Sequence, residues 1–140
     1  MPDKLIIDFI NEHHLLTLAT SKDNLSYCCN LFYVYNEENN SLIFSSDIKT
    51  KHATDFIENP NVAASIALET KDVEKIQGVQ LLGKITELKG ERINNATKQY
   101  LKEFPYAEKM KPQLWEMKLT FIKMTHNKLV FGKKLIWERF

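Results

Sequence analysis

Apolar residues recur mostly at every second position of this chain, a spacing typical of half-buried strands, and helical spacing interrupts the pattern in three places. Strands are predicted at 15–20, 25–35, 42–46, 62–68, 76–88, from 115 onward and at 129–137. Helices are predicted behind Asp3, between Thr50 and Asn59, and over 91–104. Many strands with short turns and few helices indicate a mainly β protein, an antiparallel barrel with helices at its ends.

Three details of the pattern carry further expectations. The helix after Thr50 is expected to bury Ala53, Phe56 and Ile57 on one side and to end at Asn59-Pro60. Gly83 lies inside a predicted strand, which indicates a bulge or a close backbone approach. Near the C-terminus, alternate residues are expected to face the core: Trp115, Met117, Leu119 and Phe121.

Length and composition narrow the protein class. A chain of 140 residues with 44% hydrophobic and 26% charged residues is expected to form one domain, 1–140. A net charge of +1 argues against a protein that coats nucleic acid or an anionic membrane. Neither a spanning helix of roughly 20 apolar residues nor a signal peptide is recognisable. The adjacent Cys28 and Cys29 point to opposite faces of a strand, so free thiols and a cytoplasmic location are expected.

Most common catalytic and binding motifs are absent. The histidines, His13, His14, His52 and His126, lack metal-ligand spacing, and no nucleophile elbow or glycine-rich phosphate loop is present. Aromatic residues at 32, 33 and 35 could stack on nucleic-acid bases, but no stripe of the sequence is exclusively basic. We therefore expect no metal, no nucleic acid and no membrane partner.

The turn after the third predicted strand is the strongest candidate site. Thr50, Lys51 and His52 stand in a row where a helix begins, and helix N-termini carry unpaired N–H groups and partial positive charge. This combination suits a phosphate group, although a solvated basic turn is the plain alternative. At the C-terminus, Lys133 and Trp137 fit either a pocket wall or a lysine-guarded strand edge.

Three segments together resemble the YhbP family, within the pyridoxamine 5′-phosphate oxidase-like, FMN-binding split-barrel superfamily. They are Lys49-Thr50-Lys51-His52-Ala53, the stretch from Ile76 to Ile85, and the stretch from Phe131 to Trp137. The resemblance implies a six-stranded antiparallel split β-barrel, a homodimer, and FMN bound in clefts between the subunits. Residues that recognise pyridoxal phosphate in true oxidases are not recognisable, so that activity is not predicted.

The resemblance also implies which residues contact the cofactor. Thr50, Lys51 and His52 would hold the phosphate, with Lys51 where arginine is usual and His52 where lysine is usual. The other residues implied at the flavin or along the cleft are Ser45, Ser46, Asn30, Leu31, Phe32, Gln77, Gln80, Lys133 and Trp137.

The function so implied is that of an FMN-dependent oxidoreductase acting on an unknown small molecule. No catalytic side chain is named, because simple hydride transfer to a flavin requires none. The alternative is a non-catalytic carrier or sensor of flavin or haem, with one of the histidines as axial ligand. A dimeric scaffold with an empty pocket is a third possibility.

Overall fold

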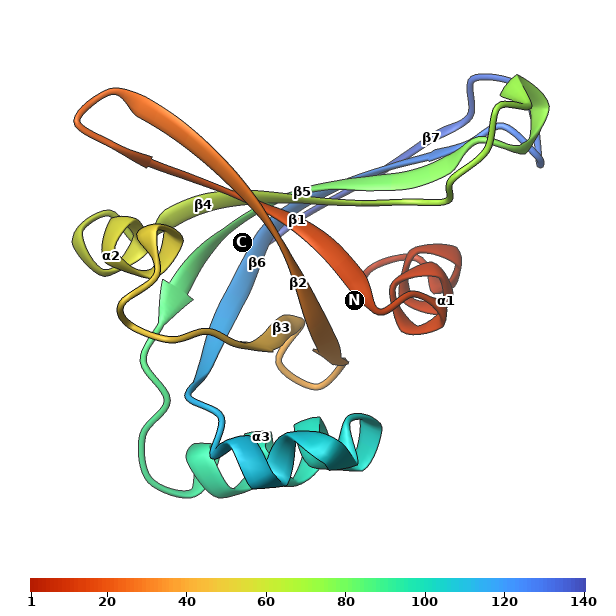
Figure 1. Cartoon of the computed structure of the whole chain (residues 1–140). Coiled ribbons are helices and arrows are strands. Elements are labelled where there is room, and N and C mark those ends of the chain that lie inside the picture. The colour runs from red at the N-terminus through yellow and green to blue at the C-terminus, as the bar shows by residue number, and fades with distance from the viewer.

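Six antiparallel strands close into a barrel, and three helices lie around it. The computed structural model describes all residues, 1–140 (Figure 1). The strands are β1 (Leu15–Lys22), β2 (Leu25–Asn36), β3 (Ser41–Ser45), β4 (Asn61–Ala67), β5 (Gln77–Thr86), β6 (Leu114–His126) and β7 (Lys134–Glu138). The helices are α1 (Lys4–Glu12), α2 (Lys51–Glu58) and α3 (Glu91–Glu103), with 3-10 turns at Val73–Lys75 and Pro105–Met110.

Strand β6 closes the barrel because two strands share one of its edges. The sheet order is β3-β2-β1-β4-β5-β6-β7, and an additional β3–β6 pairing joins the ends of the first six strands. Residues 114–118 of β6 pair with β3, whereas residues 121–125 pair with β7. The predicted mainly β, six-stranded antiparallel barrel with flanking helices is therefore confirmed, and β7 extends the sheet outside it.

The last strand is shorter than predicted. It begins at Lys134 instead of Leu129, because the chain turns through Gly132, whose φ is +77°. The Asn127 side chain accepts a hydrogen bond from the Gly132 N–H at 2.9 Å and holds that turn. Lys133 consequently lies in the turn, not on the strand.

The predicted irregularity at Gly83 is confirmed as a bulge between β5 and β6. Leu82 pairs with Phe121 and Gly83 pairs with Leu119, so Thr120 is an extra residue on β6. The extra residue shifts the alternation of β6 by one position. Met117 and Leu119 face the core as expected, but Phe121 faces outward and Ile122 takes the next buried position, so the prediction for Phe121 was wrong.

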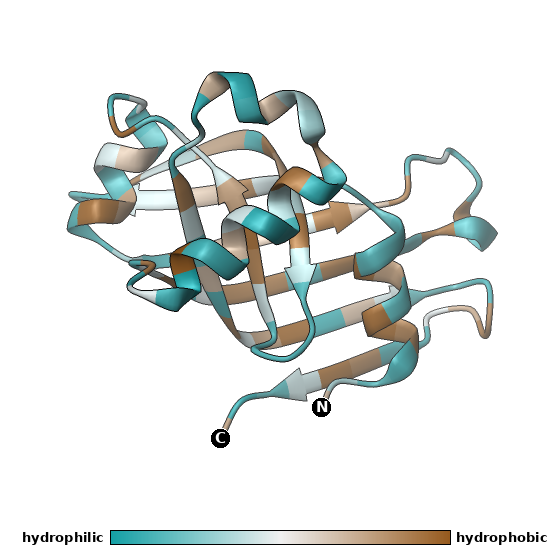
Figure 2. Ribbon diagram, turned by 90° about the horizontal axis from the view of Figure 1, so that it is seen from below, coloured by the Kyte–Doolittle hydropathy of each residue, from teal (hydrophilic) through white to brown (hydrophobic).

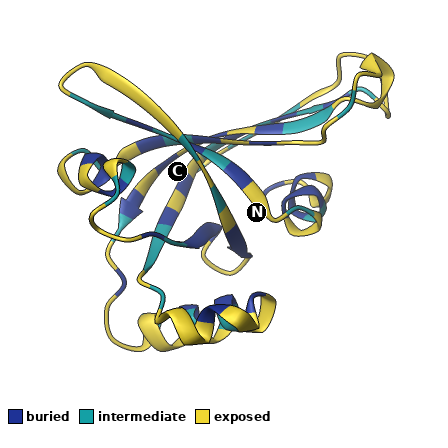
Figure 3. Ribbon diagram, viewed as in Figure 1, coloured by how far each residue is buried: buried dark blue, intermediate teal, exposed yellow.

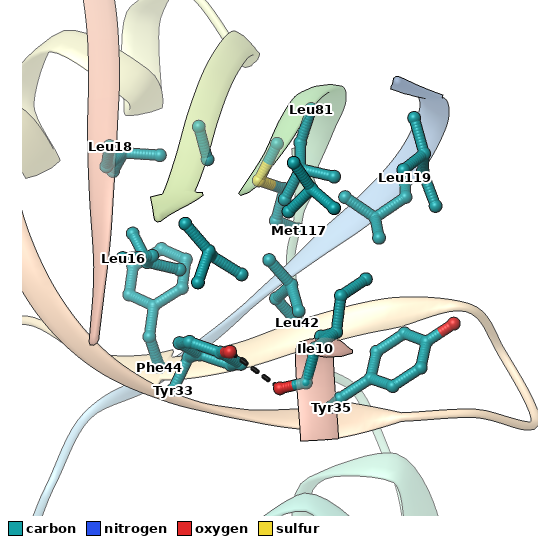
Figure 4. Packing of buried hydrophobic residues seen from close by; sticks show 14 of the residues in the cluster. Ile10, Leu16, Leu18, Tyr33, Tyr35, Leu42, Phe44, Leu81, Met117 and Leu119 are labelled. Atoms are coloured by element: carbon teal, nitrogen blue, oxygen red, sulfur yellow. Dashed lines mark hydrogen bonds between the residues drawn. The ribbon is translucent and has the colours of Figure 1, made fainter. Parts of the chain in front are cut away.

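The barrel interior is one apolar cluster of 22 buried residues, to which α1 contributes four isoleucine and phenylalanine side chains. Figure 4 shows Ile10 packed among Tyr33, Leu42 and Tyr35, where the Tyr33 hydroxyl donates to the Ile10 carbonyl at 2.6 Å. Helix α3 packs separately, with Ala96 and Tyr100 in a smaller cluster. Its hydrophobic and buried positions face the strands, while its other side is polar and exposed (Figures 2 and 3).

Alanine at Gly83 should destabilise the barrel, because its Cβ would lie 2.6 Å from the Lys118 carbonyl oxygen. Overpacking of this kind costs about 1–3 kcal/mol of unfolding free energy. Urea unfolding of Gly83→Ala measures the loss. Gly78→Ala on the same strand is the control, since its nearest neighbour would be 3.1 Å away. An equal loss in both variants would contradict the account of the bulge.

Candidate functional site

The start of α2 gathers the predicted phosphate residues at one point. Thr50 is the N-cap: its hydroxyl accepts from the Ala53 N–H at 3.3 Å and donates to the Asp47 carbonyl at 2.7 Å. The N–H groups of Lys51 and His52 have no hydrogen-bond partner within the protein. This helix end therefore offers two free donors and the positive end of the helix dipole.

Strand β3 delivers Ser46 to the same point. The His52 Nε2 atom is hydrogen-bonded to the Ser46 hydroxyl and lies 3.2 Å from the Thr50 hydroxyl. The Ser46 carbonyl accepts from the indole N–H of Trp115 at 2.9 Å, and the Ser46 N–H donates to a carbonyl of the segment before β6. Ser45, one residue earlier, is half-buried and pairs with Leu114. The structure thus brings Ser46, Thr50, Lys51 and His52 together.

Lys51 is paired with a carboxylate that sequence reasoning missed. Its Nζ lies 3.0 Å from both oxygens of Asp55, which is 1% exposed. The buried Thr20 hydroxyl on β1 donates to the same carboxylate at 3.0 Å. The spacing of four between Lys51 and Asp55 on a helix was the signal available in the sequence.

These contacts orient α2 differently from the predicted apolar face. Asp55 is buried against β1 beside Ala53 and Phe56, whereas Ile57 is 54% exposed. The prediction that Ile57 is buried was therefore wrong. Trp115 was also overlooked as part of this site: its ring packs edge-on against Phe56, with centroids 4.8 Å apart.

Burial and hydrogen bonding set the charges around α2. Burial lowers the pKa of the His52 imidazole, only partly opposed by the Asp55 charge. The hydrogen bond from Lys51 lowers the pKa of the Asp55 carboxyl below its ordinary value and outweighs the effect of burial. Near neutral pH the site therefore contains a neutral histidine and a lysine–carboxylate pair.

The outer face of the sheet carries a polar row that includes two more predicted residues. Strand register places Asn30, Thr17, Ser65 and Gln80 side by side across β2, β1, β4 and β5. The Thr17 hydroxyl donates to the Asn30 side-chain oxygen at 2.9 Å. The neighbouring row is apolar: Cys28, Ala19, Ala63, Leu82 and Phe121. Residues of both rows line a shallow cavity of about 400 Å³.

The remaining predicted residues lie apart from the start of α2. Leu31 is half-buried against the core, and Phe32 stacks on Phe104 with centroids 5.4 Å apart. Gln77 pairs with His126, whose N–H donates to the Lys133 carbonyl at 3.0 Å. Gln77 therefore lies beside the turn between β6 and β7, and Lys133 lies within that turn. Figure 1 shows α2 and this turn on opposite sides of the molecule.

Trp137, on β7, is half-buried and covered by the Arg139 guanidinium, 5.5 Å from its ring centroid. β7 lies outside the barrel, whereas Gln77 begins β5 and Lys133 lies in the turn before β7. One copy of the chain therefore does not bring these three residues to Lys51. Their assignment to a flavin cleft stays a prediction.

The sequence analysis also made predictions about free thiols, metal ligands and membrane-spanning segments. Cys28 and Cys29 are both free, and burial raises the pKa of the Cys29 thiol to about 11. His126 is buried at 8% exposure. No three His, Cys, Asp or Glu side chains are grouped closely enough to hold a metal ion. None of the helices has the length and apolar character needed to cross a bilayer.

Sequence comparison finds relatives that match almost the whole chain. It is 39% identical over 140 residues to a UPF0306 protein of Yersinia enterocolitica, covering 99% of this chain and 95% of that protein. No protein-family model matches the chain.

Solved structures share the fold at low sequence identity. A heme binding protein from Mycobacterium smegmatis has a TM-score of 0.76 and 14% identity, over 89% of this chain and 52% of that one, so this chain spans about half its length. A FAD-binding protein from Mesorhizobium loti has a TM-score of 0.71 and 15% identity, over 87% of this chain and 93% of that one.

The lowered pKa of His52 should make stability depend on pH. Between the unfolded pKa of about 6.5 and the lower folded value, the unfolded chain binds more protons, so stability falls as pH falls through this window. His52→Gln should remove this part of the acid loss, measured as urea-unfolding free energy at about pH 7.5 and pH 5. His14→Gln, at an exposed histidine outside α2, should retain it. An identical acid loss in wild type and His52→Gln would contradict the assignment.

Proposed function

The chain belongs to the UPF0306 family of bacterial proteins, and we propose that it is an FMN-binding flavoprotein that anchors the phosphate at the start of α2. The observation that carries the proposal is the grouping of Thr50, Lys51 and His52 with Ser46, beside two N–H groups that no protein atom engages. A phosphate is the ligand chemistry that such a helix start recognises. The YhbP-like resemblance assigns the phosphate to the same three residues.

The chain has no glycine-rich loop of the kind that holds a dinucleotide, and its side chains and helix start suit the single phosphate of FMN. The phosphate would meet the N–H groups of Lys51 and His52 and the Lys51 ammonium, while the Thr50 hydroxyl, which donates to the Asp47 carbonyl, fixes the helix start. The isoalloxazine would lie against the strand carrying Asn30, Leu31 and Phe32, near Gln80 of the polar row. When bound, FMN supplies hydride or electron transfer, so we propose an oxidoreductase acting on a small molecule.

A homodimer would complete the site. Gln77 and Lys133 lie at the β6–β7 turn and Trp137 lies on β7 outside the barrel, so we propose that they join the α2 site from a partner copy. The outer sheet face suits such a contact, because its small residues Ala19 and Ala63 allow close approach and its apolar row is exposed or half-buried. Each subunit would then contribute α2 to one cleft and its β5–β7 region to the other.

A haem carrier is the alternative, supported by the shared fold with a heme binding protein. Two of the four histidines are poorly placed as axial ligands: His52 Nε2 is bonded to hydroxyl groups and His126 is buried. The phosphate-type helix start has no role in that alternative. FMN is therefore preferred, and the free thiols favour a cytoplasmic location.

Titration with FMN and riboflavin, followed by flavin absorbance and fluorescence, tests the function. FMN should bind saturably and more tightly than riboflavin, because only FMN carries the phosphate. Lys51→Gln should weaken FMN binding by roughly three- to tenfold and leave riboflavin binding unchanged.

Lys49→Gln is the matched control, since it removes a lysine from the preceding turn and leaves the helix start intact. FMN affinity that is equal in Lys51→Gln and wild type would contradict phosphate anchoring there. A Soret band on adding haem, with no flavin binding, would favour the carrier.

The dimer is tested by light scattering at micromolar concentration. The wild-type mass should be twice 16.4 kDa, and Ala63→Arg should yield monomers because it places a charge on the outer sheet face. Asn95→Arg adds the same charge to the exposed side of α3 and should stay dimeric. A wild-type mass of one chain would overturn the shared cleft.

A further inference from the structure

We infer that Asp55 limits how strongly the α2 site binds a phosphate group, by neutralising Lys51. The inference rests on the proposed function, since it concerns the strength and selectivity of the same site. It assigns a role to a carboxylate that would not itself touch the cofactor. Asp55 would act through Lys51 and is a positioning and specificity residue.

The geometry ties the Lys51 charge to Asp55. Both carboxylate oxygens lie 3.0 Å from the Lys51 ammonium, and the Thr20 hydroxyl holds one of them from the opposite side. The Asp55 side chain is 1% exposed whereas that of Lys51 is 52% exposed. The carboxylate is therefore the fixed partner, and the flexible lysine is drawn to it.

A buried carboxylate keeps its cation more firmly than an exposed one. An uncompensated charge at Asp55 would be costly, so release of Lys51 to a ligand would leave a penalty behind. Lys51 also lies over the Tyr27 ring, 5.1 Å from its centroid, which favours the same position. A phosphate arriving at α2 thus competes with Asp55 for one ammonium group.

Neither neighbouring lysine is held at the helix start as Lys51 is. Lys22 pairs with Glu58 at 3.1 Å, and Lys49 lies in the exposed turn before α2, where its backbone N–H donates to the Asp47 carboxylate at 2.8 Å. His52 is hydrogen-bonded to hydroxyl groups, not to a carboxylate. The attraction for a dianion then comes chiefly from the free N–H groups and the helix dipole. Such a site would hold FMN loosely enough to exchange.

Four proteins form the test: wild type, Asp55→Asn, Lys51→Gln and the double variant. Asparagine keeps the size of the side chain and an oxygen for Thr20, but frees Lys51. Asp55→Asn should bind FMN roughly three- to tenfold more tightly than wild type, with unchanged riboflavin affinity. The double variant, which loses both charges, should bind FMN within about threefold of wild type, while Lys51→Gln binds it most weakly.

Unchanged or weaker FMN binding by Asp55→Asn would overturn the inference, as would a double variant as weak as Lys51→Gln. The FMN to riboflavin affinity ratio is the deciding readout, because a loss of packing alone would not change phosphate selectivity. If Asp55→Asn does not fold, Asp55→Ser, which keeps an oxygen for Thr20 in a smaller side chain, replaces it in both the single and the double variant.

A second measurement separates this inference from the proposed function. Inorganic phosphate should raise the melting temperature of Asp55→Asn more than that of wild type, since a ligand of the folded state stabilises it. This holds even if no flavin binds, in which case the proposed function fails and the charge inference stands. Equal rises in both proteins would overturn the inference even where FMN binds.

Discussion

The pairing of β3 with β6 is the constraint on which the rest of the structure depends. It closes the barrel, and it also fixes where β3 ends, because Ser45 pairs with Leu114 and the Ser46 N–H donates to Gln113. The chain must then turn over the barrel end and begin α2 directly beside Ser46. Since β3 occupies only the first part of the β6 edge, β7 pairs with the rest and widens the sheet outside the barrel. One shared edge thus positions the start of α2 and leaves room for β7 outside the barrel.

The sequence predicted the structure best where the chemistry of neighbouring residues agrees with the spacing of the hydrophobic residues. Helices begin behind Asp3 and Thr50 as predicted, and Gly83 marks a bulge, because helix starts and glycines act on neighbouring residues. Phe121 and Ile57 were misplaced for reasons that lie outside their own segments. An extra residue opposite β5 shifted the face of β6, and the contact of Asp55 with Thr20 set how α2 lies on β1. Such long-range contacts produce no periodic pattern of hydrophobic residues in a single sequence.

The candidate site divides in the same way. Thr50, Lys51 and His52 are neighbours in sequence, so their meeting at a helix start was predictable, whereas the Ser46–Trp115 contact depends on barrel closure. Register places Asn30 and Gln80 in one row, which only the sheet order reveals. Gln77, Lys133 and Trp137 could approach α2 only from another copy of the chain. The proposed shared site would combine local helix chemistry with an association between two copies of the chain.

The most direct test of the central claim is amide chemical-shift mapping by NMR during addition of FMN. If the start of α2 anchors the phosphate, the largest changes should fall on the Lys51 and His52 amides, with smaller changes at Ser46 and along the Asn30–Gln80 row. Riboflavin should leave the two helix amides almost unmoved. Changes confined to the far side of the barrel, around His13 and Gln99, would contradict the account and move the ligand site to the cavity between α1 and α3.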